Sequence, residues 1–386
     1  MRLLVVGAVV AALLAGCGGG APILANPPAQ RPVATPPPEP SRVVVADPQP
    51  VVLPRDDGPH RRLTEWWYYT GHLVDEGGRR WGFEYVIFRV ERGRFPVSWA
   101  AHLALTDETG GRFRYAQRTE IGRQVDRSGD DGFLELSLSP AGEAAADPDA
   151  TWDMFGFEDE AGLFARTGPG ERPSNDSIGV ALELKALKSP ALHDTDGWID
   201  LGPAGGSYYY SRTWLTATGA IFANDTTLDV TGTAWFDHQW GDFIAVGGGG
   251  WDWFAVNLDD GTDLTLYLVR DGEGGYPLVY GTLVRSDGAV EHLPAEAFSV
   301  EVTGRWLSPH TGTDYPAGWQ IDLPGEKLVI DLTPAVADQE LDTRPTTGVV
   351  YWEGSQVVQA RRDGRPLGGE AYVELTGYAR ADTAGD

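Results

Sequence analysis

The sequence predicts an all-β protein made of two related antiparallel barrels, and three observations support this prediction. Glycine and aromatic residues are abundant while methionine is rare: the chain has 50 Gly, 14 Trp, 14 Tyr, 13 Phe and 2 Met. Large apolar residues alternate with small or polar ones along short stretches that are separated by turn sequences. Two aromatic motifs also occur once in each half of the chain in the same order, which indicates an internal repeat.

The alternation is clearest over residues 81–90 (WGFEYVIFRV) and 264–270 (LTLYLVR), where it has the two-residue period of a half-buried strand. Residues 181–188 (ALELKALK) fit a helix and a strand equally well. Five sequences rich in Asp and Gly predict tight turns between neighbouring antiparallel strands. These turns lie at residues 75–78, 107–111, 259–261, 286–288 and 362–364.

The repeat divides the folded part into two units. Residues 65–69 (EWWYY) resemble residues 251–255 (WDWFA), and residues 232–237 (GTAWFD) resemble residues 369–374 (GEAYVE). We therefore expect a first unit at residues 55–242 and a second unit at residues 243–382. Closed barrels suit this pattern because closure removes the exposed edges of a sheet.

The N-terminus has the features of a bacterial lipoprotein signal peptide at residues 1–16. Arg2 precedes an apolar run from Leu3 to Leu14, and small residues come directly before Cys17. The run is about a dozen residues long, too short to cross a hydrocarbon core of roughly 30 Å as a helix. Cys17 is the only cysteine, so it cannot form a disulfide within the chain, and we expect it to carry lipid that anchors the protein to a membrane.

The composition of residues 17–54 predicts a disordered tether between this anchor and the folded part. They contain eleven prolines and few large apolar side chains, so they cannot bury enough surface to offset the entropy of ordering. We expect the protein to reside in the cell envelope, and Gly18 in place of an aspartate favours the outer membrane. A net charge of −26 and a pI of about 4.5 argue against nucleic acid and anionic headgroups as partners.

The densest candidate site is residues 232–253, where four tryptophans, three aspartates and a histidine are close together. In a strand, Asp237 and His238 point to opposite faces. His238 beside Trp240 is suited to general acid or base catalysis, because burial and a nearby carboxylate can shift its pKa. The alternative is that His238 and Asp237 satisfy backbone groups at the junction of the two units while the tryptophans fill the core.

A second cluster surrounds Glu65, which lies next to Trp66 and Trp67. A carboxyl group against an apolar wall holds its proton longer, so Glu65 is a candidate acid with a raised pKa. An ion pair between Glu65 and an arginine such as Arg61 or Arg89 is the alternative.

The remaining sequence signals are weaker. Tyr209, within residues 207–212 (SYYYSR), is a candidate to line a pocket, although packing between strands explains it as well. His102 in an apolar stretch is typical of a satisfied core histidine. No nucleotide-binding, nucleophile-elbow or metalloprotease motif is present, and no spacing of the histidines requires a metal, so we expect no cofactor.

Three segments resemble the AttH-like and carotenoid 1,2-hydratase (CrtC-like) proteins: residues 60–73 (HRRLTEWWYYTGHL), 232–241 (GTAWFDHQWG) and 351–378, which include YWEG and GGEAYVELTGY. The likeness covers residues 55–382. It implies a fold of two tandem lipocalin-like β-barrels. Members of this family are often described as secreted hydrolases, and some are lipoproteins found near ABC-transporter permeases.

In the hydratase branch, water adds to an isoprenoid double bond without a cofactor: an acid protonates the alkene and water captures the carbocation. Electron-rich rings stabilise such a cation by roughly 2 kcal/mol or more each when they are desolvated. The candidate rings, and with them the substrate contacts, are Trp66, Trp67, Trp240 and Trp253.

The resemblance also implies roles for individual residues. The family's His-x-Trp motif corresponds to His238 and Trp240, and its tyrosine to Tyr267. The acidic residue expected two positions after that tyrosine is Val269 here. The proton donor must therefore come from elsewhere, and the candidates are Asp237, Asp252 and Glu65.

Two hypotheses follow. The first is an exported, cofactor-independent hydratase or hydrolase that acts on a hydrophobic, isoprenoid or lipid-like substrate. The second is a non-catalytic lipoprotein that binds a hydrophobic ligand and passes it to a partner such as an ABC-transporter permease.

Overall fold

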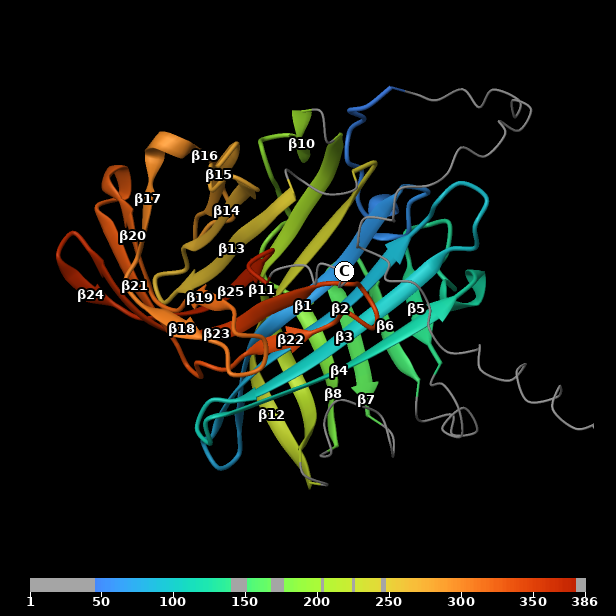
Figure 1. Cartoon of the computed structure of the whole chain (residues 1–386), viewed down its shortest axis with the longest axis horizontal. Helices are drawn as coiled ribbons and strands as arrows, with labels where there is room; N and C mark the ends of the chain where they lie inside the picture. The colour runs from blue at the N-terminus through green and yellow to red at the C-terminus, as the bar shows by residue number, and fades with distance from the viewer. Residues whose placement is uncertain are drawn as a thin grey trace, which may run out of the picture.

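A computed structural model describes residues 46–139, 151–167, 177–202, 205–223, 226–243 and 248–379. These residues form two large antiparallel sheets joined by turns and short 3-10 segments (Figure 1). The all-β prediction is therefore confirmed. The predicted signal peptide, Cys17 and most of the predicted tether lie outside the described residues. Within the described ranges, no helix has both the length and the apolar character needed to cross a membrane.

The first sheet forms a nearly closed barrel. Its strands follow the order β4-β3-β2-β1-β12-β11-β8-β7-β6-β5, with β9 and β10 paired to β11, and the end strands β4 and β5 approach each other. The strands are β1 (Thr64–Asp75), β2 (Arg80–Val90), β3 (Ser98–Asp107), β4 (Arg112–Ile121), β5 (Leu134–Leu138), β6 (Trp152–Phe157), β7 (Glu160–Arg166), β8 (Ile178–Ala186), β9 (Ala191–Leu192), β10 (Trp198–Asp200), β11 (Gly206–Ala223) and β12 (Thr226–Gly241).

The second sheet curves into a half-barrel. Its order is β16-β15-β14-β13-β25-β23-β21-β20-β17, with β22 and β24 paired to β23, and a separate pair is formed by β18 and β19. The strands are β13 (Gly248–Leu258), β14 (Asp263–Asp271), β15 (Leu278–Val284), β16 (Val290–Pro294), β17 (Ser299–Val302), β18 (Arg305–Leu307), β19 (Asp314–Pro316), β20 (Trp319–Leu323), β21 (Leu328–Pro334), β22 (Glu340–Asp342), β23 (Val350–Arg362), β24 (Arg365–Leu367) and β25 (Gly369–Thr376).

The two sheets share the same central arrangement, β3-β2-β1-β12-β11 in the first and β15-β14-β13-β25-β23 in the second. The five predicted turns each connect antiparallel neighbours, and residues 181–188 fall mainly within the strand β8. Gly248–Gly250 opens β13, with a register shift between Gly248 and Gly250.

Alternation along the strands produces three buried layers. On β1, Trp67 and Tyr69 point into the first barrel, while Tyr68 points towards the second sheet. A separate core fills the half-barrel. The third layer lies between the two sheets, and we call it the inter-sheet layer. Its apolar members are Tyr68, Val86, Ile199, Leu201, Tyr209, Trp235, Phe243, Trp253, Ala255, Tyr267, Val269, Tyr280 and Tyr372, with Trp66, Phe88, Trp251 and Leu278 partly exposed at its margin.

The sheets approach each other closely along β1 and β25 and along β2 and β23. Gly82 on β2 lies in this contact. A Cβ atom on Gly82 would lie 2.7 Å from Tyr372 Oη and 2.9 Å from Ser355 Cβ. Glycine in a strand interior is typical of a place where another part of the chain comes this close.

Candidate functional site

The predicted site residues fall into two compartments on opposite faces of the first sheet. Four of them lie inside the first barrel, where the structure brings them together as one cluster: Glu65, Trp67, His238 and Trp240. The other predicted residues belong to the inter-sheet layer or its margin; they are Trp66, Tyr209, Asp237, Asp252, Trp253 and Tyr267. The strand alternation on β1 and β12 causes this separation, because adjacent side chains point to opposite faces.

Inside the first barrel, Glu65 has no exposed surface and accepts hydrogen bonds from two histidines. His60 Nδ1 lies 2.7 Å and His238 Nε2 lies 3.0 Å from Glu65 Oε1, and the backbone N–H of His60 donates to Glu65 Oε2 over 2.9 Å. The His60 ring stacks on Trp240, with ring centres 4.1 Å apart. Arg89 Nη1 is 3.9 Å from Glu65, so the predicted arginine partner is secondary to the histidines.

The charges in this cluster are set by pairing. Burial alone raises the pKa of Glu65, but attraction to His60 and hydrogen bonds from both histidines outweigh it and leave that pKa below its usual value. Burial also opposes charge on His60, yet the Glu65 carboxylate raises the pKa of His60. Burial lowers the pKa of His238. The raised pKa that the tryptophans predict for Glu65 is therefore not found, because the histidines compensate its charge.

The ligand atoms of His60, Glu65 and His238 lie within 4.8 Å of one another, and these residue types bind zinc in proteins. Both ring nitrogens that face Glu65 are hydrogen-bonded to its carboxylate. His60 Nε2 lies 3.7 Å from Asp56. Hydrogen bonding and charge pairing thus account for the arrangement of this cluster, which ties the segment before β1 to the barrel.

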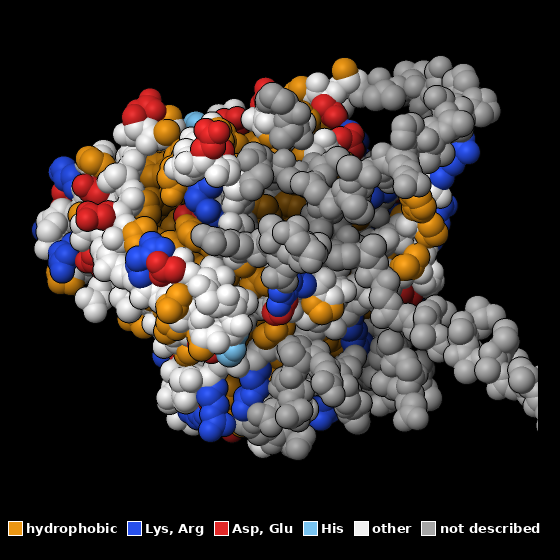
Figure 2. Space-filling view, viewed as in Figure 1, with side chains coloured by type: hydrophobic (Ala, Val, Ile, Leu, Met, Phe, Trp, Pro, Cys, Tyr) orange, Lys and Arg blue, Asp and Glu red, His pale blue; other side chains and the backbone are white. Residues whose placement is uncertain are grey.

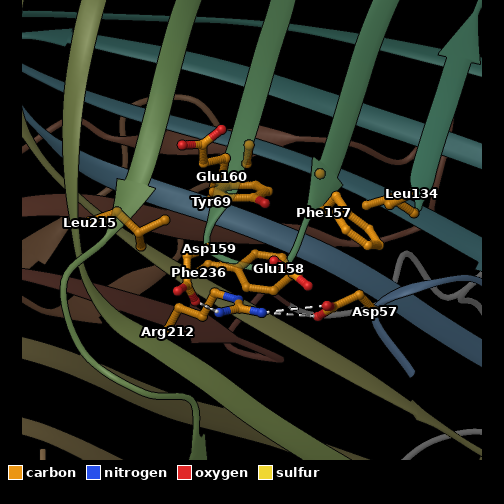
Figure 3. Close-up of a pocket in the computed structure, with 12 residues that line it drawn as sticks. Asp57, Tyr69, Leu134, Phe157, Glu158, Asp159, Glu160, Arg212, Leu215 and Phe236 are labelled. Carbon is orange, nitrogen blue, oxygen red and sulfur yellow. Dashed lines mark hydrogen bonds and ion pairs between the residues drawn. The ribbon is translucent and has the colours of Figure 1, made fainter. Parts of the chain in front are cut away.

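A hollow of about 320 Å³, partly open to solvent, lies at one end of the first barrel beside Tyr69 and Phe236 (Figure 3). Arg212 crosses it, with its guanidinium 3.4 Å from Asp57 and 2.9 Å from Asp159. The backbone carbonyl of Asp57 accepts a hydrogen bond of 3.0 Å from Trp67 Nε1. Arg212 thus pairs with both Asp57 and Asp159, so this part of the hollow is a structural junction.

In the inter-sheet layer, Asp237 accepts hydrogen bonds from three side chains. Tyr209 Oη donates to Asp237 Oδ2 over 2.5 Å. Trp235 Nε1 donates to Oδ1 over 2.6 Å, and the Ser211 hydroxyl donates to the same Oδ1. Trp253 Nε1 in turn donates to Tyr209 Oη over 3.0 Å. Burial raises the pKa of Asp237 to about 6, although the three donors act in the opposite direction.

His193 joins this network and was not among the residues singled out from the sequence. Its Nε2 lies 2.7 Å from Ser211 Oγ, and its Nδ1 lies 2.8 Å from Thr282 Oγ1 on the second sheet. Because Ser211 donates to Asp237, it accepts from His193, which leaves Nδ1 to accept from Thr282. Burial lowers the pKa of His193 to about 3, so the ring is neutral.

Three further carboxyl groups lie in the same layer. No sequence motif singled them out as site residues. Glu353 and Glu374 are directly opposite each other in the register of β23 and β25, and Glu84 approaches from β2. Tyr68 Oη donates to Glu353 over 2.7 Å, and Tyr351 Oη donates to Glu84 over 2.9 Å. None of the three has an ion-pair partner in the described part of the chain. Burial raises the pKa of all three, that of Glu374 to about 7, and repulsion from neighbouring carboxylates adds to it: from Asp237 on Glu374, from Glu374 on Glu84, and from Glu84 and Glu374 on Glu353.

His102 lies beside these carboxyl groups on β3. It is fully buried and has partners for both ring nitrogens, Tyr351 Oη at 2.8 Å and Thr346 Oγ1 at 3.0 Å. The expectation of a satisfied core histidine is confirmed, and the core in question is the inter-sheet layer.

An aromatic wall forms the margin of the inter-sheet layer. Trp66 stacks against Trp251 with ring centres 6.4 Å apart, and Trp251 lies 6.3 Å from the ring of Tyr267. Trp66, Phe88 and Trp251 are partly exposed. Hydrophobic side chains are also visible in the recess between the two halves of the molecule (Figure 2). An apolar molecule can therefore contact ring faces here without unfolding either sheet.

Two positions that the sequence singles out near this margin, Asp252 and Val269, offer no free acid. Asp252 accepts from Arg270 Nε over 3.1 Å and from Tyr378 Oη over 3.0 Å, and burial raises its pKa. Val269 is completely buried and lies opposite Trp251 in the register of β13 and β14. A carboxyl group is thus absent at position 269 on β14 but present, as Glu374, on β25, which pairs with the other side of β13.

Comparisons with known proteins match this fold and most of the chain. A sequence model of the AttH-like family matches residues 44–378. The crystal structure of a protein described as AttH from Nitrosomonas europaea aligns with a TM-score of 0.72 and 28% identity, covering 86% of this chain and 99% of that one. Kievitone hydratase from Nectria haematococca aligns with a TM-score of 0.64 and 14% identity, covering 86% of this chain and 94% of that one. No curated protein sequence matches the chain.

Proposed function

This chain belongs to the AttH-like family, and we propose that it is a cofactor-independent hydratase-like enzyme whose hydrophobic alkene substrate binds in the inter-sheet layer. One observation carries the proposal. Carboxyl groups with raised pKa values, Asp237 at about 6 and Glu374 at about 7, lie beside the tryptophan and tyrosine rings of the aromatic wall. An acid that keeps its proton near neutral pH is the group that alkene hydration needs.

The reaction needs three things from the protein. A carboxylic acid gives its proton to one alkene carbon, so that the π electrons form the new C–H bond and a tertiary carbocation results. Ring faces such as those of Trp66 and Trp251 stabilise the cation by roughly 2 kcal/mol or more each when desolvated. Water then forms the C–O bond and loses a proton to the carboxylate, which restores the acid.

The inter-sheet layer suits this chemistry better than the interior of the first barrel. In the barrel, the lowered pKa of Glu65 keeps that group ionised and the lowered pKa of His238 keeps its ring neutral. The proton that the raised pKa of His60 retains is held between Glu65 and Asp56. A narrow recess with room for about one water molecule also lies between the sheets, lined in part by His72, Trp235 and Tyr372. The prediction that His238 acts as acid or base remains open to the test given below.

The comparisons add support at the level of the fold. Kievitone hydratase is a hydratase by name, and its similarity to this chain at 14% identity extends over 94% of its length. A hydratase can therefore be built on this arrangement of two sheets. The choice of substrate class rests on the apolar rings of the wall.

The proposal is tested by incubating the purified protein with geraniol, farnesol, squalene and lycopene in H₂¹⁸O. Mass spectrometry should detect an alcohol that carries one ¹⁸O atom from the solvent. Trp251→Leu should lower the rate at least tenfold. The matched control is Trp306→Leu, at a partly buried tryptophan packed on the half-barrel core.

His238→Ala tests the barrel interior. Loss of turnover by a fully folded His238→Ala protein would move the chemistry there. Failure to incorporate ¹⁸O into any of the four alkenes contradicts the hydratase proposal.

A second candidate function is ligand binding without turnover. The exposed margin of Trp66, Phe88 and Trp251 favours it, because these rings can hold an apolar molecule whether or not an acid attacks it. Lipid extraction of protein purified from native membranes should then yield a bound hydrophobic molecule, and a partner such as an ABC-transporter permease should copurify. Consistently empty protein argues against this function.

We further propose that the protein acts at a membrane of the cell envelope, held there by lipid on Cys17 and by the proline-rich tether. An apolar substrate or ligand supports this placement, because such molecules concentrate in bilayers.

A further inference from the structure

Glu374 differs from the other acidic residues of the inter-sheet layer in its access. Glu84 and Glu353 are 1% exposed and Asp237 is 4% exposed. Glu374, on β25, is partly exposed. Any acid that touches a substrate must be reachable, so Glu374 is the one carboxyl group of this set that a molecule at the margin can contact directly.

Cross-strand pairing gives an independent reason for a proton on Glu374. Glu353 lies directly opposite it on β23, and two like charges in directly opposed positions destabilise a sheet. The titratable groups that face Glu374 from the surrounding strands are Tyr68, Glu84, Asp237, Tyr267, Tyr351 and Glu353. None of these residues is a cation, so the neutral acid is the form that this environment favours.

Hydrogen bonding leaves one oxygen of Glu374 available. Trp251 Nε1 donates to Oε2 over 2.9 Å, and Oε2 is the only oxygen of Glu374 with a hydrogen bond in the described part of the chain. Asp237 is different, because three donors already occupy its two oxygens. Trp251 therefore fixes the carboxyl group at the aromatic wall with its second oxygen open.

We propose that Glu374 is the catalytic acid of this protein and donates its proton to the alkene at the aromatic wall, with Trp251 positioning its carboxyl group. This inference rests on the proposed hydratase function and assigns the donor within it. The O–H bond of Glu374 breaks as the C–H bond forms, which leaves a carboxylate beside the carbocation. Water adds to the cation, and the proton that water loses returns to Glu374.

The internal repeat explains how this acid replaces the one missing at Val269. Glu374 ends the GEAYVE segment on β25, as Asp237 ends the GTAWFD segment on β12. The two strands hold the same place in the central arrangement of their sheets, β12 beside β1 and β25 beside β13, and both point these carboxyl groups into the inter-sheet layer. In register, Glu374 lies opposite Trp253, which in turn lies opposite Tyr267. The acid thus comes from the other neighbour of β13.

The test compares Glu374→Gln and Glu374→Asp with the wild type in the full-length protein, using the four alkenes and H₂¹⁸O. Glutamine keeps an oxygen for Trp251 but has no acidic proton, so the rate should fall by about 10²–10⁴-fold. Aspartate restores an acid on a shorter stem and should recover part of the rate. The wild-type rate should fall as the pH rises above about 7, where Glu374 loses its proton, and the residual rate of Glu374→Gln should lack this dependence.

Glu370→Gln is the matched control, because Glu370 lies on the same strand but is held by Arg80 and Thr233; its rate should equal that of the wild type. Thermal unfolding and near-ultraviolet circular dichroism establish that each variant is folded. A wild type that hydrates an alkene while folded Glu374→Gln retains the full rate overturns the assignment and leaves the hydratase function intact. A wild type that hydrates none of the alkenes overturns both.

Discussion

Asp237 and His238 are consecutive on β12, yet their side chains lie in different compartments. His238 points into the first barrel and donates to Glu65 over 3.0 Å, whereas Asp237 points between the sheets and accepts from Tyr209 over 2.5 Å. A substrate molecule in one compartment is separated from the other by the sheet itself. The two residues therefore cannot form one acid and base pair, although they are adjacent in the sequence.

Glu65→Gln should destabilise the protein by about 1.5–3 kcal/mol, the usual worth of hydrogen bonds to a charged group. The variant leaves His60 without its buried anion. Chemical denaturation compared with Glu183→Gln, at an exposed position of β8, measures the loss.

The effect of Glu65→Gln should depend on pH in a defined direction. The lowered pKa of Glu65 contributes stability above its ordinary value of 4.5. The raised pKa of His60 contributes stability below its ordinary value of 6.5, and this contribution disappears as pH rises through the folded pKa. The loss of stability in Glu65→Gln relative to the wild type should therefore be largest between pH 4.5 and pH 6.5. A loss of stability that does not change with pH contradicts the ion pair.

Glu84→Gln should stabilise the protein at alkaline pH. Burial raises the pKa of Glu84 above its ordinary value of 4.5, so the folded wild type holds this proton more tightly than the unfolded chain. That stability is present at low pH and is lost as pH rises through the folded pKa, at about 1.4 kcal/mol for each unit by which the pKa is raised.

Glutamine cannot lose that proton and still accepts from Tyr351. Melting temperatures should agree with the wild type near about pH 5 and exceed it near about pH 8. Glu301→Gln, at an exposed site on β17, should follow the wild type at both values. Equal melting temperatures for Glu84→Gln and wild type at the higher pH would show that the buried carboxyl group carries no penalty.

Gly82→Ala should lower the free energy of unfolding by about 1–3 kcal/mol, because an added methyl group overpacks the contact between the sheets. Its Cβ would meet Tyr372 Oη at 2.7 Å and Ser355 Cβ at 2.9 Å. Gly325→Ala is the control, since nothing lies within 4 Å of its added Cβ. If urea denaturation shows the same stability for both variants, the two sheets are not in contact at Gly82.

Cys17→Ser should release the protein from membranes. Cys17 is the only cysteine of the chain, so the loss of a thiol there removes the one candidate site for a thioether-linked lipid. Fractionation of cells that express either form, with incorporation of a labelled fatty acid, measures the anchor. Membrane association that survives Cys17→Ser, or a wild type without label, contradicts the lipid anchor.

The sequence by itself determined the strands and the tight turns between them. Residues 81–90 and 264–270 alternate with a period of two, and the Asp and Gly residues at positions 75–78 and 259–261 favour hairpin turns; all of these signals act between residues close in the chain. The repeat between residues 232–237 and 369–374 also predicted that two related sheets exist. Local sequence even established that Asp237 and His238 face opposite sides.

Only the tertiary structure decided what covers each side. Alternation along β12 does not state which face a second sheet will bury, so the sequence could not place Asp237 in the inter-sheet layer and His238 in the barrel. Register between β23 and β25 put Glu374 opposite Glu353, and packing of the two sheets brought His193 to Thr282. The chemistry of these groups comes from burial and from neighbours distant in sequence, and neither is written in the residues that flank them.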